Sequence, residues 1–208
     1  MASKDKKPQF WINPNTRLCC PHFSIVWNKC DKEELLDLCF IPAIRKKTYH
    51  TRSICLHIHN KSDWSGLHIF YSQDIDFENL RLQKWLRETI RDAVTERAKI
   101  VLPKRLHELE KGKQLYAKSV TVKKLRKGCL GQCSIYNQIW LSPLLVTFPQ
   151  EMMDNVILHE MAHLKHHHHR KPFWDFLSTL IGMDARQQKV IFEAVLSKYW
   201  ELYVYLMK

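Results

Sequence analysis

The chain has 208 residues, of which 45% are hydrophobic and 26% are charged. This composition excludes an intrinsically disordered chain, and the length favours a folded protein with one sizeable core. No stretch contains the roughly 20 apolar residues that a membrane-spanning helix needs, and no apolar signal core follows the N-terminus. We therefore expect a cytoplasmic protein without a membrane partner.

The charge balance is strongly basic. Lys and Arg outnumber Asp and Glu by 33 to 21, which gives a formal net charge of +12. Such a surplus attracts nucleic acid and other polyanions. The basic residues are dispersed in short clusters, however, at 45–47, 123–127 and 170–171. A solvated basic surface is therefore favoured slightly over a dedicated nucleic-acid groove, and the oligomeric state is not predicted.

The seven cysteines are irregularly spaced and do not indicate a complete disulfide framework. One hypothesis is a second metal site built from residues near the N-terminus. Its members would be Cys19, Cys20, His22, Cys30 and Cys39. Their spacing lacks a CxxC-type knuckle, so buried or incidental thiols are the favoured interpretation.

In chain order, residues 1–40 show no sustained period, and we expect an N-terminal extension of uncertain structure followed by one domain over 41–208. Alternating apolar residues at 53–58 and 67–71 predict two strands. A turn signal at 63–66 lies between them, which indicates a β-hairpin.

A helix is predicted from residue 78 to about residue 98, because apolar residues recur there with helical spacing. Asp74 and Asp76 are its candidate N-caps. A second helical stretch, interrupted near Pro103, is expected to run to about Leu109.

Two further short strands are expected at 118–122 and 138–141, around a turn-rich segment at 128–134. Three helices are expected to follow. The first begins at Pro149 and runs to about Lys165, the second begins at Pro172 and stops at Gly182, and the third is capped by Asp184.

The first of these helices carries the sequence H-E-x-x-H, from His159 through Glu160 to His163. Two histidines four positions apart lie about 40° apart on one helix face and are able to bind one ion. Imidazole suits Zn²⁺, which lowers the pKa of bound water toward about 7 when one coordination position stays open. Glu160 would then accept the proton of that water as general base.

A third ligand has to come from beyond the helix, where four consecutive histidines occupy 166–169. His169 is the preferred candidate, because a chain leaving the helix after Lys165 would loop back to present it. His166 is expected to support the site from outside the ligand shell. His167 and His168 are expected to lie in a solvated turn.

The stretch 101–182 resembles the YgjP-like metallopeptidases, a zincin family related to the SprT-like and Wss-type proteases. The resemblance rests on the residues 156–164, on His169 and on the pair Phe173 and Trp174. It implies that His159, His163 and His169 bind zinc and that Glu160 is catalytic. Phe173 and Trp174 are expected to pack behind the active-site helix, and Cys133 is expected to be a buried thiol and no nucleophile.

Upstream, the family pattern W-G-S-C-S corresponds to the residues 130–134, where Leu130 and Gln132 replace Trp and the first Ser. This departure bears on substrate contacts and leaves the metal ligands unchanged. His166 occupies the position of the metzincin Gly, so the chain is not placed among metzincins.

Together these features predict an α+β, zincin-like domain, with a small twisted sheet packed on the active-site helix and further C-terminal helices. The leading hypothesis is a Zn²⁺-dependent metallopeptidase whose peptide substrate pairs with the strand at 138–141. Two alternatives are a metal-dependent hydrolase of a nucleotide phosphoanhydride and a basic nucleic-acid-associated module.

Overall fold

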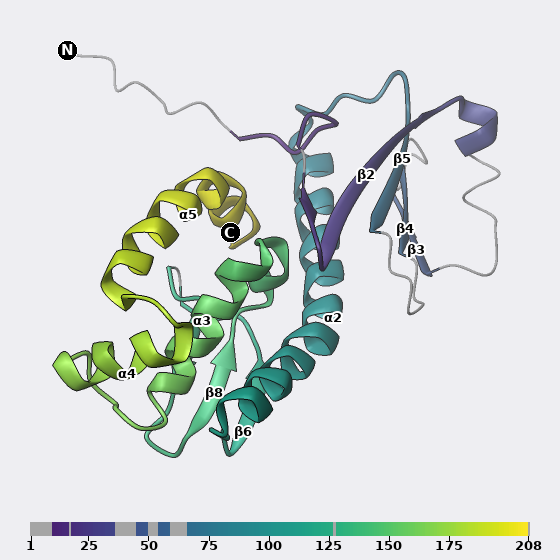
Figure 1. The fold of residues 1–208 in the computed structure, drawn as a ribbon. Coiled ribbons are helices and arrows are strands. Elements are labelled where there is room, and N and C mark those ends of the chain that lie inside the picture. The colour runs from purple at the N-terminus through teal and green to yellow at the C-terminus, as the bar shows by residue number, and fades with distance from the viewer. Residues whose placement is uncertain are drawn as a thin grey trace, which may run out of the picture. The chain divides into compact units, whose positions relative to one another are not determined.

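The computed structural model describes residues 10–16, 18–35, 45–49, 54–58, 66–126 and 128–207. Helices and small sheets alternate along the chain (Figure 1), which confirms the predicted α+β class. The chain forms two compact units, one comprising 1–17, 25–91 and 201–208 and the other 18–24 and 92–200. Among the described helices, none is both long and apolar enough to span a membrane.

The first unit contains a sheet in the order β2-β5-β4-β3. Strands β4 (Ile54–Ile58) and β5 (Leu67–Ser72) pair antiparallel, with Ile54 opposite Tyr71, so the predicted hairpin is confirmed. Its turn residues 63–65 lie outside the described residues. Strand β3 (Arg45–Thr48) pairs antiparallel with β4.

Strand β2 (Phe23–Cys30) lies in the segment for which the sequence predicted no structure. From Ile25 onward it pairs parallel with β5, its partner some forty residues away in sequence. The predicted domain boundary near residue 40 falls outside the described residues, as does Cys39, and it stays a prediction.

Helix α2 (Leu80–Lys113) is one continuous helix, so the predicted interruption near Pro103 is wrong. Proline costs about 3 kcal/mol in a helix interior. Leu102 and Leu106 are buried next to it, and each contributes about 1.5 to 3 kcal/mol, which outweighs that cost.

The N-cap of α2 also differs from the prediction. The Oδ1 atom of Asn79 accepts hydrogen bonds from the backbone N–H groups of Arg81 and Leu82, at 3.0 and 3.1 Å. The Oδ1 atom of Asp76 instead accepts a hydrogen bond from the backbone N–H of Glu78, in the turn that precedes the helix. Asn79 therefore satisfies the first free N–H groups of the helix, one turn later than expected.

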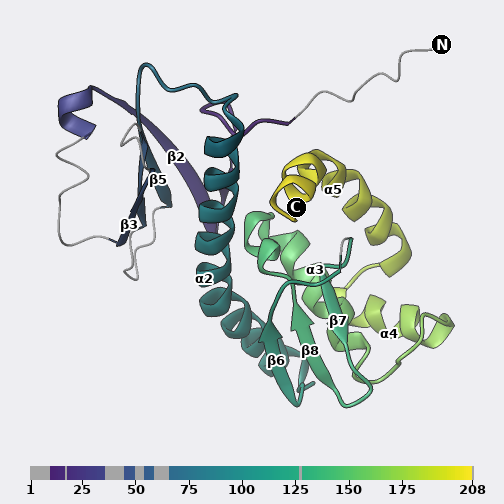
Figure 2. The same ribbon diagram turned by 180° about the vertical axis from the view of Figure 1, so that it is seen from behind.

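The second unit contains a three-stranded sheet in the order β6-β8-β7. Strands β6 (Ser119–Val122) and β8 (Gln138–Leu141) confirm the two predicted strands, and they pair parallel. Strand β7 (Gly131–Cys133) lies within the segment predicted as a turn, and it pairs antiparallel with β8. Figure 2 shows the three strands side by side, with α3 behind them.

Because β8 is hydrogen-bonded on both sides, it has no free edge for a peptide. The hypothesis that substrate pairs with the strand at 138–141 is therefore wrong. The two edge strands of this sheet are β6 and β7, and β7 contacts α3.

Three helices follow a 3-10 turn at Pro143–Thr147. Helix α3 (Gln150–Ala162) has Pro149 as its N-cap and packs on β7 and β8. Helix α4 (Lys171–Ile181) ends at Gly182, whose φ of 78° is the left-handed conformation that favours glycine. Helix α5 (Ala185–Met207) is capped by Asp184, as predicted. The remaining strand, β1 (Cys19–Cys20), pairs antiparallel with the start of β2.

An ion pair joins α2 to α3 within the second unit. The guanidinium of Arg105 donates two hydrogen bonds of 2.7 Å to the two carboxylate oxygens of Asp154. Both side chains are largely buried, and the interaction raises the pKa of Arg105. Paired geometry of this kind fixes the helix that carries the candidate site.

Asp154→Asn removes the charge and one acceptor of this pair. We expect the free energy of unfolding to fall by about 1 to 2 kcal/mol, measured by urea denaturation. Glu108→Gln is the matched control, since Glu108 contacts the same guanidinium at 2.8 Å from a more exposed position. It should cost about 0 to 0.5 kcal/mol. Equal losses in the two variants would contradict the prediction.

Candidate metal centre

Helix α3 forms because its buried stripe, which includes Met152, Met153 and Ile157, packs under the sheet. This packing places His159 and Glu160 in the last turn of the helix. His163 follows at the C-cap with helical backbone angles, φ −68° and ψ −19°. The local helix therefore presents two imidazoles on one face, as the sequence predicts.

The structure brings His169 to the same place. One ring nitrogen from each of His159, His163 and His169 lies within 4.8 Å of the others. The Nε2 atoms of His159 and His169 face each other at 2.9 Å. Within the described part of the chain, this is the only group of three or more His, Cys, Asp or Glu side chains that converges in this way.

Two aromatic residues of α4 hold this arrangement. Phe173 is fully buried, and its ring centroid lies 4.9 Å from that of His159 and 4.6 Å from those of His163 and His169. Trp174 donates a hydrogen bond of 3.0 Å from its indole N–H to the carbonyl oxygen of His169. Phe173 is a core residue, as predicted, but it packs against the three histidine rings and not behind the helix. Trp174 is only half-buried, so its predicted core packing is wrong, and it positions the loop that carries His169.

The other histidines of the run have different surroundings. The carbonyl oxygen of His166 lies 2.9 Å from Nδ1 of His163, so it accepts a hydrogen bond when that nitrogen is protonated. His166 thus supports the site through its backbone. Its ring lies against Phe176, with the two ring centroids 5.7 Å apart. His167 and His168 are exposed in the bend that precedes α4, as the sequence predicts.

The three imidazoles are suited to hold a metal cation. Burial, followed by the nearby His163, His169 and Lys189, lowers the pKa of His159 to about 3. Burial also lowers the pKa values of His163 and His169. All three rings are therefore neutral at physiological pH, and a neutral imidazole has the lone pair that a transition metal needs. The hydrogen bond at Nδ1 of His163 leaves its Nε2 free for such a role.

Glu160 is buried beside these rings, with 6% of its surface exposed. Burial raises the pKa of its carboxyl to about 8, and a hydrogen bond donated by the backbone N–H of Cys133 partly opposes this rise. A Cβ atom at Gly131 would lie 2.6 Å from Cγ and 2.7 Å from Oε1 of Glu160. Glycine is therefore required for β7 to approach the carboxylate this closely.

Sequence analysis did not identify Gly131 or the backbone of Cys133 as parts of the site. The sequence signal for them is the match of 130–134 to the family pattern, in which Gly131 and Cys133 are retained. Their contribution is through the backbone, so residue type alone does not reveal it.

The hypothetical second metal site does not form among its described members. Cys20 is buried, and its thiol lies 3.0 Å from the carbonyl oxygen of Thr147. His22 is hydrogen-bonded to Gln150, and Cys30 packs with Leu35 in the first unit. The six described cysteines are free thiols.

Cys133 is adjacent to Glu160 but is poorly suited to nucleophilic chemistry. Burial and the Glu160 carboxylate raise the pKa of its thiol to about 11, so only about one molecule in 10⁴ carries a thiolate at pH 7.

We expect iodoacetamide to modify the exposed Cys19 at neutral pH and to leave Cys133 unmodified until the pH approaches 11, as measured by peptide mass spectrometry. Equal modification of the two thiols at pH 7 would contradict this.

The family model described as "YgjP-like, metallopeptidase domain" matches residues 45–191, a longer stretch than the resemblance at 101–182. The match includes the three histidines and Glu160. No curated protein and no solved structure matches the chain. Since the family model covers more than half of the sequence, the chain belongs to the YgjP-like family of metallopeptidase domains.

Proposed function

We propose that this protein is a zinc-dependent peptidase in which His159, His163 and His169 hold the metal and Glu160 is the general base. The observation that carries the proposal is the convergence of three neutral ring nitrogens within 4.8 Å beside a buried carboxylate. Three protein ligands with an open position are typical of catalytic zinc sites. The family supports peptides or proteins as substrates.

A bound divalent cation would polarise the peptide carbonyl, lower the pKa of water and favour the ionised form of the nearby Glu160. Glu160 then accepts a proton from the attacking water and passes it to the amine nitrogen of the leaving peptide. A carboxyl whose burial raises its pKa toward neutrality is suited to this exchange, because it binds and releases a proton at similar cost.

The edge of β7 is the strand that best suits substrate binding. Cys133 donates its N–H toward Glu160, so this edge of the strand faces the reacting groups. An extended peptide that added to β7 would place its backbone beside Glu160. Strand β7 therefore replaces β8 as the proposed docking strand.

Of the two alternative functions, hydrolysis of a phosphoanhydride needs the same metal and base, and the family description favours the peptide bond over it. A nucleotide panel belongs in the activity assay for this reason. No contact among the described residues specifically favours a nucleic-acid-binding module.

The metal assignment predicts about one zinc ion per chain after gel filtration. Elemental mass spectrometry of the purified protein measures this content. His163→Ala should lose most of this zinc, because it removes one of three ligands. His168→Ala is the matched control, since this exposed histidine lies in the same run, and it should retain the metal. Equal zinc content in both variants would reject the assignment.

The catalytic assignment predicts that Glu160→Gln binds zinc normally and hydrolyses peptides about 10² to 10⁴ times more slowly. Glutamine has nearly the same shape and cannot accept the proton. Hydrolysis of a mixed peptide pool, followed by mass spectrometry, gives the rates. An unchanged rate in this variant would overturn the role of Glu160, and activity on nucleotides alone would overturn the peptidase assignment.

Gly131→Ala should lower kcat/KM by about 10²-fold, because the new methyl group displaces the carboxylate of Glu160. Zinc content should remain, since no ligand is touched. Gly112→Ala is the control, because its added methyl group meets nothing within 4 Å. Full activity of Gly131→Ala would show that the carboxylate position is not critical.

A further inference from the structure

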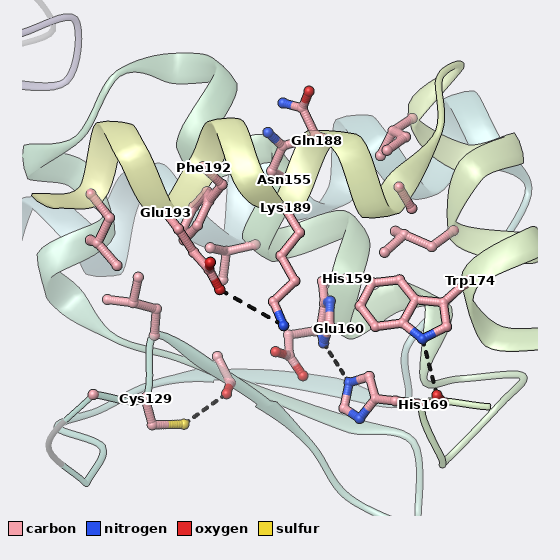
Figure 3. A pocket seen from close by; sticks show the side chains of 18 residues that line it. Cys129, Asn155, His159, Glu160, His169, Trp174, Gln188, Lys189, Phe192 and Glu193 are labelled. Carbon is pink, nitrogen blue, oxygen red and sulfur yellow. Dashed lines mark hydrogen bonds and ion pairs between the residues drawn. The ribbon is translucent and has the colours of Figure 1, made fainter. Parts of the chain in front are cut away.

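A pocket of about 600 Å³ opens directly beside the candidate metal centre. Figure 3 shows His159, Glu160 and His169 at the pocket, with Trp174 beside them. All its lining residues belong to the second unit. They come from the segment before and at the start of β7, from α3, from the loop that carries His169, and from α4 and α5. The pocket therefore begins where the scissile bond has to lie under the proposed function.

The walls that lead away from the histidines are apolar. Six of the apolar lining residues come from four segments: Leu130, Val156, Leu177, Ile181, Phe192 and Leu196. Binding of an apolar group against such a wall is favourable because it removes apolar surface from water. Binding of a charged group there is unfavourable because its charge would be left unpaired. Apolar pockets with a few polar groups at one end are typical of ligand sites.

The two charged residues of α5 that line the pocket have opposite signs. Lys189 and Glu193, one turn apart on α5, approach to 3.8 Å, and both side chains are more than half exposed. The other polar residues on α5 and α3, Gln188 and Asn155, are neutral amides. The lining beyond the histidines and Glu160 therefore presents no uncompensated charge, which favours a neutral occupant over an acidic or basic side chain.

From these observations we propose that the pocket binds a large apolar side chain, aliphatic or aromatic, of the residue that flanks the scissile peptide bond. This inference rests on the proposed peptidase function and names its substrate class. The volume of about 600 Å³ lies in the range of pockets that enclose whole small ligands, so an aromatic ring fits. The adjoining edge of β7 would hold the peptide backbone while the side chain enters the pocket.

The test compares peptides that differ only at this flanking position, which carries Ala, Leu, Phe, Asp or Lys. Wild-type protein loaded with zinc should cleave the Leu and Phe peptides with a kcat/KM at least about tenfold higher than the Ala peptide, and the charged peptides least. Binding of the same labelled peptides to zinc-loaded Glu160→Gln, measured by fluorescence polarisation, should show the same order. The binding assay is independent of turnover.

Two pocket variants should shift this preference in opposite directions. Ala185→Phe adds a ring to the pocket lining, so the variant should cleave the Ala peptide faster than the Leu and Phe peptides. Phe192→Ala widens the pocket, so this variant should prefer the Phe peptide over the Leu peptide more strongly than wild type does. Ala194→Phe is the matched control, because Ala194 is an exposed residue of α5 outside the pocket lining, and it should leave the preference unchanged. A variant that fails to fold would lose cleavage of all peptides, so misfolding cannot produce opposite shifts of peptide preference in the two variants.

The outcomes separate the two proposals. Cleavage of all five peptides at similar rates, or the same preference in all three variants, would overturn the pocket assignment while leaving the peptidase function intact. An absence of cleavage with a preserved binding order in Glu160→Gln would overturn the peptidase function and support the pocket. A preference for Asp or Lys peptides would show that the rim charges, Lys189 or Glu193, select the substrate.

Discussion

The site depends on the packing of three imidazoles against one buried phenyl ring. His159 and His163 reach Phe173 from α3, and His169 reaches it from the loop that precedes α4. This packing partly shields the rings from water, which lowers the pKa values of all three, and their ring nitrogens lie within 4.8 Å of one another. The hydrogen bond from Trp174 to the His169 carbonyl holds the backbone that carries the third ring, so α4 also supports the site.

The approach of β7 to α3 gives the carboxylate its position. Glycine at 131 lets the strand lie against Glu160, and the N–H of Cys133 supplies a hydrogen bond in surroundings where an unpaired carboxylate is costly. The same strand has the sheet edge that faces the site, because β8 is paired on both sides. Glu160, the free edge of β7 and the apolar pocket thus lie around a single short strand.

Under the proposed function, the C-terminal helices would contribute to specificity through the pocket that they line. Helix α5 supplies Phe192 and Leu196 to the wall and the opposed charges of Lys189 and Glu193 to the rim. These residues lie beyond the H-E-x-x-H motif and are not among the proposed metal ligands.

The sequence by itself determined the features that depend on residues close in the chain. The four-residue spacing of His159 and His163 specifies a shared helix face, alternation specifies the β4–β5 hairpin, and Gly182 and Asp184 specify where helices end and begin. The tertiary structure decided the rest, because those features depend on contacts between distant segments. Burial of Leu102 and Leu106 kept α2 continuous through Pro103, and Trp174 supports His169 at the site among four neighbouring histidines. Likewise, only the fold revealed Gly131, whose importance lies in the absence of a side chain next to Glu160.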